Sequence, residues 1–131
     1  MKAFIRVMKA LSDPNRVKMM KMLQIRPLCV CEIKEALGIA QSTASKHLKI
    51  LEDAELVRSF KDGLWVNYSL SDGSGSSYSA SMIENLKHWL DSESEIQKLN
   101  QILPGIDRHD IVGKEQTGKK ICSIESLNDH I

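Results

Sequence analysis

The sequence contains few cysteines. There are three in 131 residues, and two of them occur as Cys29-Val30-Cys31. Positions this close are poorly placed to pair with each other, and a domain with 42% hydrophobic residues can form a core without disulfides. Lys2 and Arg6 interrupt the first residues too early for the apolar region of a secretory signal. We therefore expect a cytoplasmic protein with reduced thiols.

Long apolar runs and enzyme motifs are also missing. No run approaches the roughly 18 apolar residues that span a bilayer, so we expect no membrane association. Neither a glycine-rich phosphate loop nor a pair of carboxylates in a pocket-forming context is present, which argues against an enzyme and an obligatory cofactor. The length and the 27% charged residues are typical of one soluble domain.

The net charge of +1 hides two halves of opposite sign. Residues 1–70 carry twelve Lys and Arg against seven Asp and Glu, whereas residues 71–131 carry six against ten. A basic half joined to an acidic half favours a polyanionic partner for the first half.

The first half has the periodicity of short helices. Phe4, Met8 and Leu11 have the spacing of one buried helical face. Asp13 is a natural cap and Pro14 suits a first helical position, so a second helix is expected there. We expect this helix to bury Val17, Met20 and Leu23 and to end before Arg26-Pro27.

A helix-turn-helix and a hairpin follow. Residues 28–31 alternate as a short extended segment would, residues 32–37 form a short helix ended by Gly38, and residues 41–54 form a longer one. Two β-prone runs, 56–61 and 64–70, then flank Asp62-Gly63, a strong hairpin signal; Leu64, Val66, Tyr68 and Leu70 share one face of the second run. This order predicts a mainly α fold with a small β wing, a winged helix-turn-helix.

The remainder is less regular. Residues 71–81 are rich in serine and glycine and predict a linker. Residues 82–103 are expected to form one helix, whose apolar stripe a second copy of the chain would bury. We expect a DNA-binding and dimerisation domain over 1–103 and a flexible tail over 104–131.

Four segments in register resemble the ArsR/SmtB family of metal- and metalloid-responsive repressors. They are Ala10-Leu11-Ser12-Asp13-Pro14-Asn15-Arg16, Leu28-Cys29-Val30-Cys31-Glu32-Ile33, Gln41 through Leu51, and Gly63 through Leu70. The resemblance covers about residues 3–100. It implies a homodimeric winged-helix repressor that binds a palindromic operator in double-stranded DNA.

The helix over 41–54 is the candidate recognition helix, because short polar side chains and cations gather at the end that would enter the major groove. Its candidate DNA-contacting residues are Gln41, Ser42, Thr43, Ser45, Lys46 and His47, and Lys61 is the candidate on the wing. Alternatively, these residues only start a helix and form its solvated face, as a lone hairpin lysine also can. The family commonly has serine at the cap position that Ala40 occupies here.

The cysteine pair is the candidate sensor. If Leu28 and Val30 point into the core, Cys29 and Cys31 point away from it on a common side and can share a soft ion. Cys31 also lies near a helix N-terminus, which favours the thiolate. The alternatives are that the cysteines are small buried hydrophobes, or that they sense oxidation, by forming a disulfide with Cys122 or by glutathione capping.

In arsenic-sensing relatives a third cysteine follows three residues after this pattern, where this sequence has Lys34. As(III) and Sb(III) take three thiolates, so Cys122 is the candidate third ligand, unless a thiol from solution supplies it. The family's other metal site is not matched around His88. We thus expect a repressor that a thiophilic ion, such as As(III) or Sb(III), releases from DNA; a redox-sensing repressor and a winged-helix interaction module that does not bind DNA are the alternatives.

Overall fold

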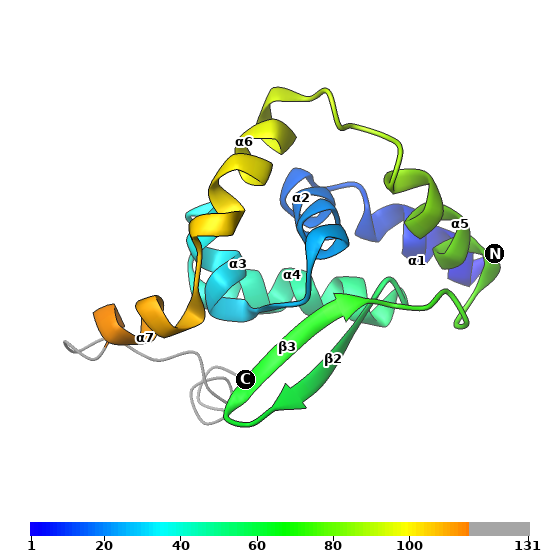
Figure 1. The fold of residues 1–131 in the computed structure, drawn as a ribbon. Coiled ribbons are helices and arrows are strands. Elements are labelled where there is room, and N and C mark those ends of the chain that lie inside the picture. Colours follow the sequence, from blue (N-terminus) through cyan, green and yellow to red (C-terminus); the bar gives the residue numbers. More distant parts are fainter. Residues whose placement is uncertain (116–131) are drawn as a thin grey trace.

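The computed structural model describes the fold of residues 1–115 and the side chains of residues 1–111. Its elements are α1 (Lys2–Ala10), α2 (Pro14–Ile25), β1 (Leu28–Cys29), α3 (Val30–Leu37), α4 (Gln41–Asp53), β2 (Val57–Asp62), β3 (Trp65–Leu70), α5 (Ser77–Leu86), α6 (Ser94–Ile102), the 3-10 turn η1 (Leu103–Gly105) and α7 (Arg108–Glu115). The helices pack around α2, and the β2–β3 hairpin projects from one side (Figure 1). The predicted winged helix-turn-helix is therefore confirmed.

The first two helices form where the sequence predicts. On α1 the expected Met8 and Leu11 pack half-buried against the core, but the most buried face is shifted. Val7 and Ala10 are buried, whereas Phe4 is 41% exposed. Asp13 caps α2 as expected: its carboxylate accepts from the backbone N–H of Asn15 (2.8 Å) and of Arg16 (3.2 Å). On α2 itself Met20 and Leu23 are buried and Val17 is half-buried.

The sheet is antiparallel with the order β1-β3-β2. Asp62 pairs with Trp65, so the turn of the hairpin is Gly63-Leu64, one residue later than predicted. Gly63 has a φ of +62°, a left-handed conformation that favours glycine. Leu64 is 64% exposed in this turn. The prediction that it belongs to the apolar face of the second strand is therefore wrong, because β3 begins at Trp65.

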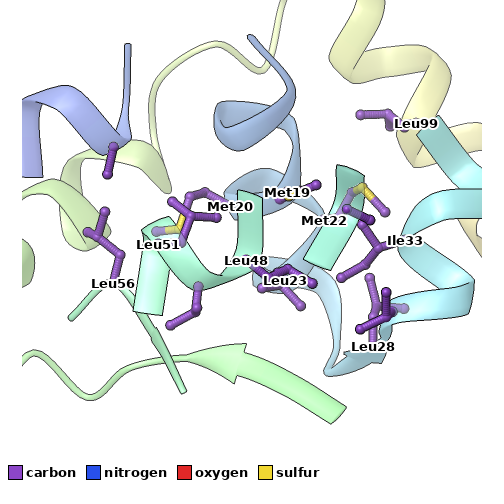
Figure 2. Close-up of a cluster of buried hydrophobic side chains, with 14 of the residues drawn as sticks. Met19, Met20, Met22, Leu23, Leu28, Ile33, Leu48, Leu51, Leu56 and Leu99 are labelled. Atoms are coloured by element: carbon purple, nitrogen blue, oxygen red, sulfur yellow. The ribbon is translucent and has the colours of Figure 1, made fainter. Parts of the chain in front are cut away.

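The core lies between α2, α3 and α4. Three methionines of α2 lie among leucines of α4, with the residues of β1 and α3 beside them (Figure 2). The large side chains that are fully buried here include Met19, Met20, Met22, Leu28, Ile33, Leu48, Leu51 and Leu56. Burial of each such side chain contributes about 1.5–3 kcal/mol, so this cluster holds the helix-turn-helix rigidly on α2.

The predicted helix over 82–103 is wrong, because it is divided into α5 and α6 by residues 87–93. The buried ammonium of Lys21 on α2 donates to the carbonyls of Leu86 (2.6 Å) and Trp89 (2.8 Å) and to the carboxylate of Asp91 (2.7 Å). Leu90 adopts a left-handed φ of +70° at the break. These bonds replace the helical bonds that the carbonyls at the end of α5 would otherwise make.

The apolar stripe of this region is covered by the chain itself. Ile83, Leu86, Ile96, Leu99 and Leu103 are buried in the core cluster. The expectation that a second copy buries this stripe is therefore incorrect. The linker also ends earlier than predicted, because Ser76 caps α5 by accepting from the N–H of Ser79 (3.0 Å).

Residues 104–111 pack against the body of the molecule. Ile111 is buried, and α7 lies against α3 (Figure 1). The remainder of the predicted tail, including Cys122, lies outside the described residues, so the boundary at 103 stays a prediction.

Candidate nucleic-acid interface and thiol site

The candidate recognition helix α4 begins at Gln41, immediately after a tight turn. Gly38 ends α3 in a left-handed conformation (φ +67°), and its N–H donates to the carbonyl of Lys34 (2.8 Å). Ala40 is the N-cap of α4 and offers no side-chain acceptor, as its side chain predicts. The turn holds α4 against α3 and presents its N-terminal end to solvent.

Burial divides the predicted DNA-contacting residues into two groups. Ala44, Leu48 and Leu51 face the core. Exposed on the opposite face are Ser42, Thr43 and Lys46, whereas Gln41, Ser45 and His47 are half-buried. Gln41 Nε2 and Ser45 Oγ are shielded from solvent and have no hydrogen-bond partner in the described part of the chain.

His47 is held by a residue that the sequence did not single out. Arg16 Nη1 lies 3.0 Å from His47 Nδ1, and Arg16 Nε donates to the carbonyl of Ala10 (2.7 Å). Arg16 belongs to the Ala10–Arg16 segment that carries the family resemblance, but nothing in that segment indicates a contact with His47.

The wing carries one cation of the predicted kind and two exposed apolar side chains. Lys61 is exposed, as are Phe60 and Leu64. Arg58 is engaged with the linker, because its guanidinium donates to the carboxylate of Asp72 (2.7 Å) and the hydroxyl of Ser74 (2.9 Å).

The tip of the wing is joined to α7. Arg108 donates to the carboxylate of Asp62 (3.0 Å) and the amide oxygen of Asn67 (3.3 Å), and its guanidinium lies 4.8 Å from the ring centroid of Trp65. His109 meets the same ring edge-on at 6.0 Å. Sequence reasoning missed this cluster because it assigned residues 104–131 to a tail.

The two thiols of the candidate sensor are brought together. Cys29 Sγ and Cys31 Sγ lie 2.6 Å apart, so the prediction of a common side is correct. The extended segment, however, covers only Leu28 and Cys29, and α3 begins at Val30. Cys29 and Cys31 are both fully buried rather than directed away from the core. The sulfurs come together because the chain turns from β1 into α3 between the two cysteines, not because both lie on one face of an extended strand.

Cys29 is the N-cap of α3 in a capping-box arrangement. Its N–H donates to Glu32 Oε1 (2.9 Å), and Glu32 Oε2 accepts from Arg26 (3.1 Å). Burial raises the pKa of Glu32, while the bonds from Cys29 and Arg26 act in the opposite direction. Arg26 also donates to the carbonyl of Ile106 (2.9 Å) and so joins this end of α3 to the segment that leads into α7.

Cys29 is also a residue of the sheet, where it pairs with Asn67 of the wing strand β3. Lys34 is half-buried on α3, at the position that holds a third cysteine in the resemblance. In the part of the chain that the structure describes, no three His, Cys, Asp or Glu side chains form a metal-binding group. The described residues therefore bring together two thiols as candidate ion ligands.

His88 is exposed, and its Nε2 lies 3.8 Å from Glu84 Oε1. This agrees with a surface position. Within residues 1–115 no helix has the length and hydropathy needed to cross a membrane.

Comparison with known proteins agrees with this architecture. A family model described as "Bacterial regulatory protein, arsR family" matches residues 13–59. The arsenical resistance operon repressor of Escherichia coli K12 is 31% identical over 120 residues, which cover 91% of this chain and 95% of that protein. The chain belongs to the ArsR family. It is therefore a member of a family of DNA-binding transcriptional regulators.

Other ArsR-family relatives match over shorter segments. The transcriptional repressor SmtB homolog of Synechocystis is 40% identical over 63 residues, 48% of each chain. The chain spans about half to three fifths of the length of several curated relatives that it matches. Among solved structures, HlyU from Vibrio cholerae superimposes with a TM-score of 0.57 at 30% identity, covering 68% of this chain and 92% of that chain; its reduced form gives the same TM-score.

Proposed function

We propose that this ArsR-family protein is a transcriptional repressor that binds an operator in the ligand-free state and leaves it when a thiophilic ion such as As(III) or Sb(III) binds Cys29 and Cys31. The carrying observation is the contact between the two sulfurs, 2.6 Å apart at the start of α3. Soft ions select thiolate ligands, and the N-terminus of a helix favours the thiolate. Relatives that are named arsenical resistance operon repressors support this choice of ion.

Ion binding sets the separation of the two sulfurs. Metal–sulfur bonds are about 2.3 Å long, and at any angle of 90° or more they place two sulfurs about 3.3 Å or more apart. An ion that bridges both thiolates therefore fixes the side chains of Cys29 and Cys31, which already lie together, at this separation. The third thiolate comes from Cys122 or from a thiol in solution, since the described residues bring only two together.

A rearrangement at the two cysteines is transmitted to the DNA-binding elements through two sets of contacts. Cys29 pairs with Asn67 in β3, the second strand of the wing. Cys31 lies in α3, which is joined to α4 by the short turn at Gly38 and packs against it. Coupling of about 1–3 kcal/mol between ion and DNA is sufficient for release and is reciprocal.

The active form in this proposal is a homodimer on a palindromic operator. Each half of the palindrome would bind one recognition helix, because the symmetry of the operator mirrors that of the dimer. Exposed apolar side chains on α1 and α5 offer the surface: Phe4, Ile5 and Tyr78 are each 41–43% exposed. Phe4 and Tyr78 meet edge-on at 5.5 Å and so join the two helices into one face. This face replaces the stripe over 82–103, which the chain itself buries.

The test uses a duplex selected from random-sequence DNA by the wild-type protein. Fluorescence anisotropy is measured with arsenite, with antimonite and without either. We expect wild type to lose affinity with metalloid, and Cys29→Ser and Cys31→Ser to bind DNA and no longer respond. Unchanged wild-type affinity at saturating metalloid removes the inducer proposal. Cys122→Ser is the matched thiol variant: equal metalloid stoichiometry by thiolate absorption leaves Cys122 out of the site.

The second candidate is a redox-sensing repressor, and the same sulfur contact favours it. In an extended segment these two positions are poorly placed to pair, but the turn from β1 into α3 brings their thiols together. Hydrogen peroxide would take two electrons from Cys29 and Cys31, forming one S–S bond, and would be reduced to two waters with the two thiol protons. If hydrogen peroxide releases DNA reversibly with dithiothreitol while metalloid does not, the redox function replaces the metalloid function.

A further inference from the structure

The side chain of Arg16 contacts two separate helices. Its Nε donates to the carbonyl of Ala10 (2.7 Å) and its Nη2 to that of Lys9 (3.3 Å), both at the end of α1. Its Nη1 lies 3.0 Å from Nδ1 of His47 on α4. The guanidinium is thus held by α1 on one side and holds the recognition helix on the other.

This contact determines where the imidazole carries its proton. A guanidinium has donors and no acceptor, so a ring nitrogen in hydrogen-bond contact with it must be the acceptor. A neutral imidazole that accepts at Nδ1 carries its hydrogen on Nε2.

We propose that Arg16 is a positioning residue of the DNA-binding surface: its guanidinium donates to His47 Nδ1 and so orients the imidazole to present Nε2–H to DNA. The proposal rests on the DNA-binding function given above. An Nε2–H donor pairs with acceptors in the major groove, such as guanine N7 and O6 or thymine O4, or with a phosphate oxygen. Lys46 on the same helix is exposed, whereas His47 is half-buried against Arg16.

The first test reads the tautomer directly in the full-length protein. Long-range proton–nitrogen correlation spectra of the ¹⁵N-labelled protein distinguish Nε2–H from Nδ1–H, and the signals of His47 are those lost in His47→Ala. We expect Nε2–H in wild type and a mixture of tautomers in Arg16→Met. A wild-type imidazole protonated on Nδ1, or an Arg16→Met spectrum identical to wild type, overturns the proposal.

Ser12→Ala is the matched control. Ser12 Oγ donates to the carbonyl of Lys9 (2.6 Å), so this variant also removes a side-chain bond at the end of α1 but leaves Arg16 and His47 in place. We expect the wild-type tautomer and DNA affinity from it. An altered tautomer in Ser12→Ala would mean that the end of α1, not Arg16, orients the imidazole.

The second test is a double-mutant cycle in affinity for the selected duplex. Loss of one such hydrogen bond weakens binding about fivefold, so we expect this loss in Arg16→Met, in His47→Ala and in the double variant alike. A further loss on adding Arg16→Met to His47→Ala shows that Arg16 acts only through the fold and contradicts the proposal. Wild-type protein that selects no duplex contradicts the proposed function instead, and the tautomer measurement still decides the role of Arg16.

Two further variants leave Arg16 untouched, so they test the donor even if Arg16→Met does not fold. The amide N–H of His47→Gln reaches the position of Nε2, whereas the amide of His47→Asn ends near the position of Nδ1. We expect His47→Gln to bind within about threefold of wild type and His47→Asn about fivefold more weakly. Equal losses in the two variants overturn the assignment of Nε2–H as the donor.

Discussion

Arg108 and Asp62 form an ion pair of 3.0 Å between α7 and the last residue of β2, so a helix distant in sequence holds the tip of the wing. The same guanidinium packs over Trp65, the first residue of β3. Both strands of the hairpin are therefore fastened at their turn. Two residues beyond Trp65 in the same strand, Asn67 pairs with Cys29 of β1.

We expect Arg108→Ala to loosen the tip of the wing without unfolding the protein. The pair is partly exposed, so its loss costs about 1 kcal/mol or less of global stability. Amide hydrogen exchange over residues 60–66 is expected to accelerate, while exchange in α2 stays unchanged. Lys87→Ala, which removes the exposed pair with Glu84, is the control and is expected to leave the wing as it is. Equal exchange at the wing in all three proteins would show that α7 does not restrain it.

Lys21→Met is expected to destabilise the protein more than Arg108→Ala. It removes the donor to two carbonyls and leaves the carboxylate of Asp91 without its partner, at a cost of about 3 kcal/mol in the free energy of unfolding. Urea denaturation followed by circular dichroism measures this cost. Lys18→Met on the same helix removes only an outer pair with Glu95 (3.4 Å), and we expect a loss below about 1 kcal/mol. Similar losses in the two variants would contradict the role given to Lys21.

Ala40→Ser is expected to stabilise the protein. Ala40 has the extended φ and ψ of an N-cap and no side-chain acceptor, whereas serine would accept a backbone N–H in the first turn of α4. The expected gain in the free energy of unfolding is about 0.5–1 kcal/mol. Ala40→Val keeps the site uncapped and is expected to give no gain; a melting temperature that rises equally in both variants would exclude capping as the cause.

The cap at Asp13 makes part of the stability dependent on pH. Burial raises the pKa of Asp13, but the backbone N–H groups of Arg16 and Asn15 outweigh it, and the pKa lies below its ordinary value of 3.8. A lowered folded pKa means that the stabilisation is present above the unfolded pKa and is lost as pH falls through the folded pKa. We expect Asp13→Ala to cost about 1 kcal/mol at neutral pH. This difference from wild type should shrink below pH 3.8.

Asp13→Asn is the control for this dependence, because asparagine keeps the cap acceptor and does not titrate. Chemical denaturation at several pH values measures both variants. A difference between wild type and Asp13→Ala that stays constant down to the lowest pH would show that the carboxylate charge does not contribute.

The sequence predicted the helix-turn-helix and the hairpin closely, because their signals are local. Gly38 ends α3 and Gly63 forms the hairpin turn as their conformational freedom predicts. Ala44, Leu48 and Leu51 share one helical face and are buried together. The candidate DNA-contacting residues on α4 also follow from this face, although their contacts with DNA stay a prediction.

Contacts between distant segments settled the rest. Arg16 meets His47 across 31 positions, Arg108 meets Asp62 across 46, and Lys21 meets Leu86 across 65. Periodicity indicates which face of a helix is apolar, but not whether the same chain or a second copy covers it. The stripe over 82–103 and the burial of Cys29 and Cys31 were therefore misjudged. Hydrophobic patterning acts within a segment, whereas the satisfaction of buried polar groups depends on what folding brings beside them.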